Sequence, residues 1–220
     1  MKKRIRLQGS LMFIALAAMC VFYKALVPQR HNNAAEAALA IASSVSIAAG
    51  FLFRIASRGY KSENSDNSFA LVTGGPYSLS RNPMYFGTFL IGLGISLAIF
   101  SWWVWVIFCF IYLAIYIPQI RKEEDLLLGR FKGEYERYCV SSPRFFPDIT
   151  KMTRANISFK QRWVLPELPS LLIVVFVITA VNAFRGIAWS GLMLILFTVI
   201  ATGLFYEKEN IPKKSQDNTK

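Results

Sequence analysis

Cysteine and histidine are scarce in this chain of 220 residues, which carries three cysteines and a single histidine. Cys20, Cys109 and Cys139 stand far apart and show none of the close spacings typical of zinc sites or redox motifs. His31 is alone, so the sequence offers neither a histidine-based metal centre nor the histidine of a catalytic triad. We therefore expect a protein that binds no metal ion.

Acidic residues are also few, with 13 Asp and Glu against 25 Lys and Arg and a formal net charge of +12. In a soluble protein such a charge would suggest nucleic acid as a partner. Here, however, the basic residues flank apolar runs, and no zinc-finger spacing or RNA-binding motif is present. The charge therefore predicts contact with membrane headgroups and excludes a nucleic-acid partner.

Long hydrophobic runs are what the chain has in abundance, since 54% of its residues are hydrophobic. A membrane-spanning helix needs roughly 20 mostly apolar residues. Six runs approach that length: 7–27, 34–53, 84–100, 104–120, 168–184 and 187–206. The first run could be a signal peptide cleaved near Ala35-Glu36-Ala37, but it is longer than a signal core. We predict an all-α, polytopic membrane bundle of about six transmembrane helices with a cytoplasmic helical segment that binds a cofactor.

The basic residues fall almost entirely on one side of the predicted membrane. Of the 25 Lys and Arg, 22 lie in the segments 1–6, 54–81, 121–162 and 208–220, which six spans would place on the same side. Basic loops stay in the cytoplasm. We therefore expect a multi-pass protein, of a bacterial cytoplasmic membrane, with both termini and its active site on the cytoplasmic side.

A polar, turn-rich stretch, GGPYSLSRNPMYFG at 74–87, comes directly before the third apolar run. Gly74-Gly75-Pro76 predicts a tight turn. Asn82-Pro83 predicts a helix start, with Asn as the N-cap and Pro at the first helical position. Arg81 would then lie at a helix N-terminus, where backbone N–H groups and a guanidinium favour an anion. The alternative is a capped helix start whose Arg81 contacts lipid phosphate.

Four motifs follow one another in order: LVTGGPY (71–77), RNPMYFG (81–87), EEDLLLGRFKGEYERY (123–138) and PRFFP (143–147). With these motifs, residues 69–147 resemble the isoprenylcysteine carboxyl methyltransferase and phospholipid methyltransferase family of integral-membrane enzymes. The resemblance implies S-adenosylmethionine as the cofactor. It also implies that the cofactor binds to Phe69, Ala70, Leu71, Val72, Tyr77, Asn82, Pro83, Met84, Tyr85 and Glu123.

The third and fourth apolar runs, at 84–100 and 104–120, are joined by three residues and must form an antiparallel hairpin. At about 1.5 Å per residue the two runs have similar lengths, so their distal ends return to the same depth. Arg81 and Asn82 should therefore lie close to Glu123 and Glu124. Alternatively, the two glutamates lie on a solvent-exposed face of the helix and pair with neighbouring cations.

This juxtaposition suits S-adenosylmethionine, a cofactor with a carboxylate and two cationic groups. Arg81 would bind the carboxylate, whereas Tyr135 and Tyr138 would offer aromatic faces to the cations. The two tyrosines could equally be anchors at the membrane interface. Methyl transfer from a sulfonium needs alignment and exclusion of water rather than a metal.

Two positions depart from the prenylcysteine enzymes of the family. Asn82 replaces a histidine, and Gln119 replaces an arginine that binds the acceptor carboxylate. Arg121 is a candidate substitute, although two residues rotate it roughly 200° around a helix. An amine or hydroxyl acceptor would need a base, for which Glu124 is the candidate. We therefore predict Glu124 and Arg121 as catalytic residues. The predicted acceptor is lipid-like or isoprenoid-like, enters from the bilayer and is methylated on oxygen.

The predicted organisation has four parts: two N-terminal transmembrane helices in 1–60, a methyltransferase core in 61–150, two additional transmembrane helices in 151–206, and a polar tail in 207–220. Three other functions stay open: a phospholipid N-methyltransferase, a non-enzymatic membrane protein that retains the scaffold, and a reductase that binds NADPH in a similar pocket. Binding of the cofactor separates the enzymes from the non-enzymatic protein.

Overall fold

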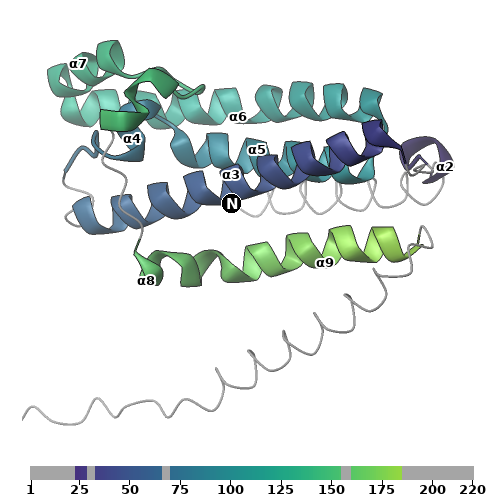
Figure 1. Ribbon diagram of the computed structural model, residues 1–220. Helices are drawn as coiled ribbons and strands as arrows, with labels where there is room; N and C mark the ends of the chain where they lie inside the picture. The colour runs from purple at the N-terminus through teal and green to yellow at the C-terminus, as the bar shows by residue number, and fades with distance from the viewer. Residues whose placement is uncertain (1–22, 29–32, 66–69, 155–159, 185–220) are drawn as a thin grey trace, which may run out of the picture. The chain divides into compact units, whose positions relative to one another are not determined.

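The structure, a computed structural model, describes residues 23–28, 33–65, 70–154 and 160–184. Within these residues all regular structure is helical, which confirms the predicted all-α class (Figure 1). The elements are α2 (Tyr23–Leu26), α3 (Ala34–Asn64), α4 (Pro76–Leu79), α5 (Pro83–Ile99), α6 (Trp102–Phe131), α7 (Gly133–Ser141), the 3₁₀ turn η2 (Ile149–Arg154), α8 (Gln161–Val164), the 3₁₀ turn η3 (Leu165–Glu167) and α9 (Leu168–Phe184).

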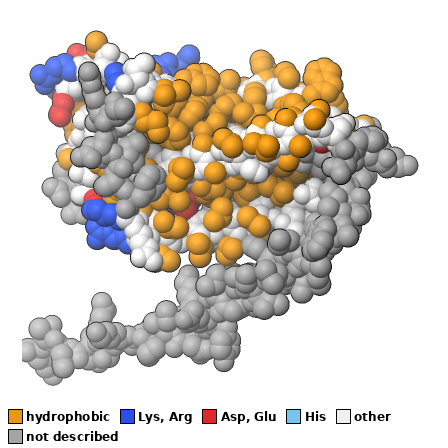
Figure 2. Space-filling view, viewed as in Figure 1, with side chains coloured by type: hydrophobic (Ala, Val, Ile, Leu, Met, Phe, Trp, Pro, Cys, Tyr) orange, Lys and Arg blue, Asp and Glu red, His pale blue; other side chains and the backbone are white. Residues whose placement is uncertain are grey.

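Three of the described helical stretches are long and apolar enough to cross a membrane: Ala34–Asn64, Trp102–Phe131 and Gln161–Ala183. Helix α5 is apolar but shorter, with 17 residues. Hydrophobic side chains spread widely over the surface in Figure 2, as expected of a protein surrounded by lipid. The predicted span 187–206, the tail 207–220 and all but the end of the span 7–27 lie outside the described residues.

The chain forms two compact units, Met1–Leu168 and Pro169–Lys220. Helix α9 makes up the described part of the second unit, and its sequence is continuously apolar except for a few small polar residues. One of these, Thr179, donates its hydroxyl hydrogen bond to the carbonyl of Val175 within the helix, so the polar group is satisfied locally. All other elements described below belong to the first unit.

Helices α3 and α5 pack with their backbones in close approach. A Cβ atom added to Gly50 would lie 2.6 Å from the carbonyl oxygen of Gly87. Ser43 and Ser46 donate hydroxyl hydrogen bonds of 2.8 Å to the carbonyls of Gly94 and Leu90 across the same interface. Such small-residue packing with interhelical hydrogen bonds is typical of membrane helices.

Helices α5 and α6 form the predicted hairpin, joined at Phe100 and Ser101. Phe108 of α6 fills the space beside Gly92 of α5. Phe89, Tyr112, Ile120 and Phe145 form a buried core where the two helices meet the segment after α7. The aromatic side chains of α5 and α6 thus form a continuous surface from the middle of the hairpin to its polar end. We call this surface the aromatic wall.

Helix α3 extends much further than the sequence predicts. Hydropathy ends the second span at residue 53 and predicts a polar loop over 54–82, and this prediction is wrong for its first part, because α3 continues to Asn64. Its charged end keeps a buried face, with Ile55, Ala56 and Ser57 inside, so the helix stays amphipathic after its hydropathy falls. At about 1.5 Å per residue, helices of 30 and 31 residues exceed the roughly 30 Å hydrocarbon core. Their ends therefore project from the membrane.

The segment 160–167 is anchored to the projecting end of α3 by two carboxylates. Glu63 accepts hydrogen bonds from Lys160, Arg162 and the indole of Trp163. Glu167, which is 1% exposed, forms ion pairs of 3.0 and 2.9 Å with Arg54 and Arg58. These paired charges fix the position of α3 beyond the membrane and so support one wall of the site.

Candidate functional site

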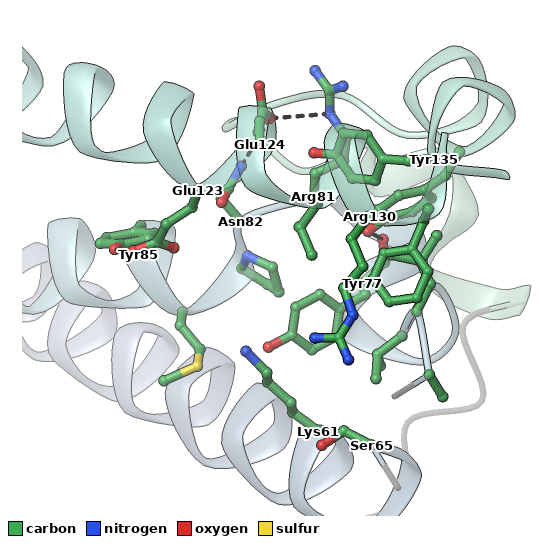
Figure 3. Close-up of a pocket in the computed structure, with 18 residues that line it drawn as sticks. Lys61, Ser65, Tyr77, Arg81, Asn82, Tyr85, Glu123, Glu124, Arg130 and Tyr135 are labelled. Carbon is green, nitrogen blue, oxygen red and sulfur yellow. Dashed lines mark hydrogen bonds and ion pairs between the residues drawn. The ribbon is translucent and has the colours of Figure 1, made fainter. Parts of the chain in front are cut away.

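A cavity of about 200 Å³ lies at the polar end of the hairpin, between the projecting ends of α3 and α6 and the segments that follow (Figure 3). Figure 2 shows charged side chains gathered at this end of the helices. The lining residues come from six parts of the chain: Lys61, Ser65, Ala70, Leu71, Val72, Tyr77, Arg81, Asn82, Pro83, Met84, Tyr85, Glu123, Glu124, Leu127, Arg130, Phe131, Tyr135 and Tyr138.

The structure brings the predicted site residues together in this one cavity. Every predicted cofactor-binding residue that the structure describes lines it. Phe69 lies outside the described residues. Of the two predicted catalytic residues, Glu124 lines the cavity, whereas Arg121 is exposed and is not among the lining residues. What each residue binds or catalyses remains a prediction.

Tyr77, Tyr135 and Tyr138 form a buried aromatic cluster on one side of the cavity. The turn before Tyr77 depends on Gly75, whose φ of +57° favours glycine, and on the Tyr60 ring packed against it. The Tyr138 hydroxyl donates a hydrogen bond of 2.7 Å to the Tyr77 carbonyl and so ties α7 to α4. Burial raises the pKa of all three hydroxyl groups above the usual range, so they remain neutral.

Helix α5 begins as predicted, with Asn82 at the N-cap position and Pro83 at the first turn. The expected capping hydrogen bond from the Asn82 side chain is absent, and that prediction is wrong. Its amide group instead donates to the carbonyl of Arg144 at 2.9 Å and to Oε1 of Glu124 at 3.3 Å. The buried carboxylate of Glu124 needs hydrogen-bond donors, and this requirement outweighs the local preference of Asn82 for capping the helix.

Glu124 is the centre of a charged network that joins three segments of the chain. Its carboxylate is 7% exposed. Arg144 donates to Oε2 at 2.8 Å, and Nε of Arg81 forms an ion pair with Oε1 at 3.4 Å. The Arg81–Glu124 contact lacks hydrogen-bond geometry, because Nε of Arg81 has no hydrogen-bond partner among the described residues. Both the hairpin prediction and the closeness of Arg81 and Asn82 to the glutamate pair are confirmed.

Glu123 has a different environment from that of its neighbour. Its Oε1 accepts hydrogen bonds from the Tyr85 hydroxyl at 2.5 Å and from the amide of Gln119 at 3.0 Å. Both donors are neutral. In Figure 3, Glu123 and Tyr85 lie together on the opposite side of the cavity from Tyr77 and Tyr135.

Sequence reasoning missed five of the lining residues: Lys61, Ser65, Leu127, Arg130 and Phe131. Helical spacing could have found three of them, because Leu127, Arg130 and Phe131 follow Glu123 by four, seven and eight positions on one helix face. Lys61 and Ser65 were hidden by the assignment of their segment to a loop. Figure 3 shows Lys61 reaching into the cavity from α3.

In the described part of the chain, no group of three or more metal-ligating side chains comes together. The site is instead a polar cavity lined by guanidinium, ammonium, carboxylate and phenol groups, placed at the end of a membrane-embedded helical hairpin. The fold and the site thus define a helical membrane protein with a cavity lined by charged and aromatic side chains at the end of its hairpin.

Residues 35–133 match the model of the phospholipid methyltransferase family. The match spans a little under half of the chain and includes α3 to α6, most of the cavity lining and both glutamates. It confirms the family resemblance of the sequence motifs over these residues. The tyrosines of α7 and the PRFFP segment lie beyond the matched residues.

Two curated proteins resemble the chain over a shorter stretch. The nickel-cobalt-cadmium resistance protein NccN of Alcaligenes xylosoxydans xylosoxydans is 34% identical over 83 residues, which is 38% of each chain. The cobalt-zinc-cadmium resistance protein CzcN of Cupriavidus metallidurans is 35% identical over 80 residues, 36% of this chain and 37% of CzcN. The chain therefore aligns with well under half of either relative. No solved structure matches it at a comparable level of significance.

Proposed function

We propose that this protein is an integral-membrane methyltransferase that uses S-adenosylmethionine to methylate a lipid-like or isoprenoid-like acceptor, with oxygen as the favoured site. The observation that carries the proposal is the convergence of separate motifs on one cavity. Residues 70–72, 77, 81–85, 123–124, 135 and 138 are far apart in sequence but line the same space. The match to a methyltransferase family over residues 35–133 supports the same reaction class.

The cavity's chemistry fits the proposed cofactor. A carboxylate would be attracted by the cations that line it, Lys61, Arg81 and Arg130. Cationic groups would be attracted by Glu123 and by the faces of the neutral tyrosines. When bound, S-adenosylmethionine would supply an activated methyl group on its sulfonium. The residues of this chain would hold it in line with the acceptor and keep water out.

The acceptor is proposed to come from the bilayer, because one lining residue of the cavity belongs to the apolar hairpin and contacts its aromatic side chains. Tyr85 lines the cavity and packs against Tyr116 at 5.5 Å between ring centroids. Tyr116 in turn stacks on Tyr112 at 4.2 Å, within the aromatic wall of α6. On the outer side of α6, Phe110 and Ile115 are exposed and suited to contact acyl chains. An amphiphile could keep its tail there while its head reaches the glutamates.

The test is binding of cofactor followed by transfer of its methyl group. Purified protein in lipid nanodiscs is titrated with S-adenosylmethionine by calorimetry, with NADPH as the competing candidate. Methyl-tritiated cofactor is then incubated with the protein and a total lipid extract. We expect saturable cofactor binding, no displacement by NADPH, and label in a lipid fraction. Absence of binding to S-adenosylmethionine would overturn the proposal and favour a non-enzymatic role or a reductase.

A second candidate is transfer to nitrogen of a phospholipid headgroup, which the description of the matched family favours. The labelled product separates the two candidates. A methyl ester releases labelled methanol on mild alkaline hydrolysis, whereas an N-methylated headgroup retains its label under the same treatment. Volatile label supports a carboxylate oxygen as the acceptor atom, and label retained in a headgroup amine supports the second candidate.

A further inference from the structure

Glu123 and Glu124 are neighbours in sequence, but their partners differ in charge. Glu124 is buried and is held by two guanidinium groups and an amide, from Arg81, Arg144 and Asn82. Glu123 is only partly buried, and its contacts are two neutral donors, the hydroxyl of Tyr85 and the amide of Gln119. The two carboxylates are therefore suited to different tasks.

Glu124 is poorly suited to take up a proton during a reaction. A proton on this carboxylate would leave the buried guanidinium of Arg81, and the partly exposed guanidinium of Arg144, without the charge that compensates them. Each of its oxygens already has a partner. Its contacts join the start of α5 to α6 and to the segment after α7, which is a structural task.

Glu123 can take up a proton without losing its partners. Tyr85 and Gln119 both donate to Oε1, and no hydrogen bond to Oε2 is present among the residues that the structure describes. A proton on Oε2 would leave both donors in place. Tyr85 and Gln119 thereby fix the orientation of the carboxylate and leave its second oxygen to the cavity.

Glu123 also lies where an acceptor from the bilayer would arrive. Its partner Tyr85 is continuous with the aromatic wall of α5 and α6 through Tyr116 and through the Tyr112 hydroxyl, which donates to the Tyr85 carbonyl at 2.7 Å. The tyrosine cluster, which suits the cofactor, lies on the other side of the cavity, and Lys61 reaches in from α3 below them (Figure 3).

We propose that Glu123 is the general base of the reaction and that the acceptor atom is an amine nitrogen or a hydroxyl oxygen, which carries a proton, rather than a carboxylate oxygen. This inference rests on the proposed function. The lone pair of the acceptor atom forms the bond to the methyl carbon, the bond between that carbon and sulfur breaks with its electrons left on sulfur, and the acceptor's proton passes to Oε2 of Glu123. A carboxylate acceptor would face the charge of Glu123 with only the neutral amide of Gln119 beside it.

Three single-chain amphiphiles that differ only in their head group test the proposal: oleylamine, oleyl alcohol and oleic acid. Wild-type protein in nanodiscs is expected to methylate the amine or the alcohol from tritiated S-adenosylmethionine and to leave the acid unmodified. At saturating cofactor, Glu123→Gln should lower that rate at least 100-fold, and calorimetry on the same variant separates this loss of turnover from any loss of cofactor affinity.

Gln119→Arg is the complementary variant, and Glu136→Gln, an exposed change on α7, is the control. Because a guanidinium pairs with a carboxylate, the new side chain should allow oleic acid to bind and should slow the reaction of the amine. Glu136→Gln should behave as wild type, and thermal unfolding in detergent shows whether each variant is folded.

A wild type that binds the cofactor but methylates neither amine nor alcohol overturns this inference, as does a folded Glu123→Gln protein with the wild-type rate. Neither result contradicts the proposed function if oleic acid or a lipid extract accepts the tritiated methyl group. A wild type that does not bind the cofactor overturns the proposed function and this inference together.

Discussion

At the scale of single residues, the charges of this protein are divided between holding the chain together and lining the cavity. Glu124 is largely withdrawn from solvent and compensated by Arg81 and Arg144. Lys61 projects from α3 into the same cavity, and the described part of the chain gives it no ion pair. Substitutions in the Glu124 network should therefore affect stability most, whereas substitution of Lys61 should affect binding of the cofactor.

Replacement of Glu124 by Gln should lower the free energy of unfolding by about 1–3 kcal/mol, because it leaves the buried guanidinium of Arg81 uncompensated, whereas the more exposed Arg144 is screened by solvent. The measurement is chemical or thermal unfolding of the purified variant in detergent. Glu136→Gln, on the exposed face of α7, should change stability by less than about 0.5 kcal/mol. Equal stability of the Glu124 variant and the wild type would show that the network contributes nothing.

Replacement of Lys61 by Met should weaken binding of S-adenosylmethionine about tenfold while stability is retained, because it removes a cation from the cavity and keeps the length of the side chain. Calorimetry gives the affinity directly. Lys122→Met is the matched control, since Lys122 is exposed on α6 and does not line the cavity. If the two variants bind the cofactor equally, Lys61 is not a cofactor contact.

At the scale of elements, the position of the cavity depends on how closely α3 and α5 approach. Gly50 and Gly87 face each other, and a Cβ atom on Gly87 would lie 2.7 Å from the carbonyl oxygen of Gly50. No side chain can enter without parting the helices, since the obstacle is backbone on both sides. The register of α3 against α5, and with it the placement of Lys61 beside the cavity, is thus set within the membrane.

Gly50→Ala should destabilise the folded protein by about 1–3 kcal/mol, as expected for overpacking at a rigid contact. Gly129→Ala is the control, because nothing lies within 4 Å of a Cβ atom at that position of α6. That variant should be neutral or stabilised by up to about 1 kcal/mol, since alanine favours helix more than glycine does. Unfolding of both variants in the same detergent provides the comparison, and similar losses in the two would argue against a close helix contact at Gly50.

The elements show clearly which features local sequence can predict. The start of α5 at Pro83 and the hairpin of α5 and α6 follow from turn residues and hydropathy, which are local signals. The end of α3 does not, because hydropathy falls at Arg54 although the helix continues. Partners from distant segments decide that region: Glu167 compensates Arg54, and Trp163 packs against Gly59. The side chain of Asn82 was misjudged for the same reason, since its acceptors come from α6 and residue 144.

At the scale of the whole molecule, the membrane class and the grouping of motif residues could be predicted from composition and motif order. Lys61 could not be found, because its place in the cavity requires the extended α3. The division into 1–60, 61–150, 151–206 and 207–220 remains a prediction. Every residue of the cavity lies in the compact unit Met1–Leu168, whereas the polar tail lies in the other unit.

The orientation of the molecule in the membrane can be tested at the two ends of α3. We expect Asn64 to face the cytoplasm and Ala34 the opposite side, because basic residues accumulate in the segments beyond Arg54. Ala34→Cys and Asn64→Cys are made separately in a protein without Cys20, Cys109 and Cys139. An impermeant thiol reagent should label the first in intact cells and the second only after permeabilisation. Equal labelling of both in intact cells would contradict the topology.

Helix α6 runs without interruption from Trp102 to Phe131 and carries both the lipid-facing wall and the two glutamates. A continuous helix transmits a change of tilt along its length, and tilt is how membrane helices adapt to bilayers of different thickness. Glu123 would then move relative to Lys61, which stands on a different helix. The thickness of the membrane would thus affect the rate of the proposed methyl transfer. We expect turnover to vary between bilayers with acyl chains of about 14 and about 22 carbons.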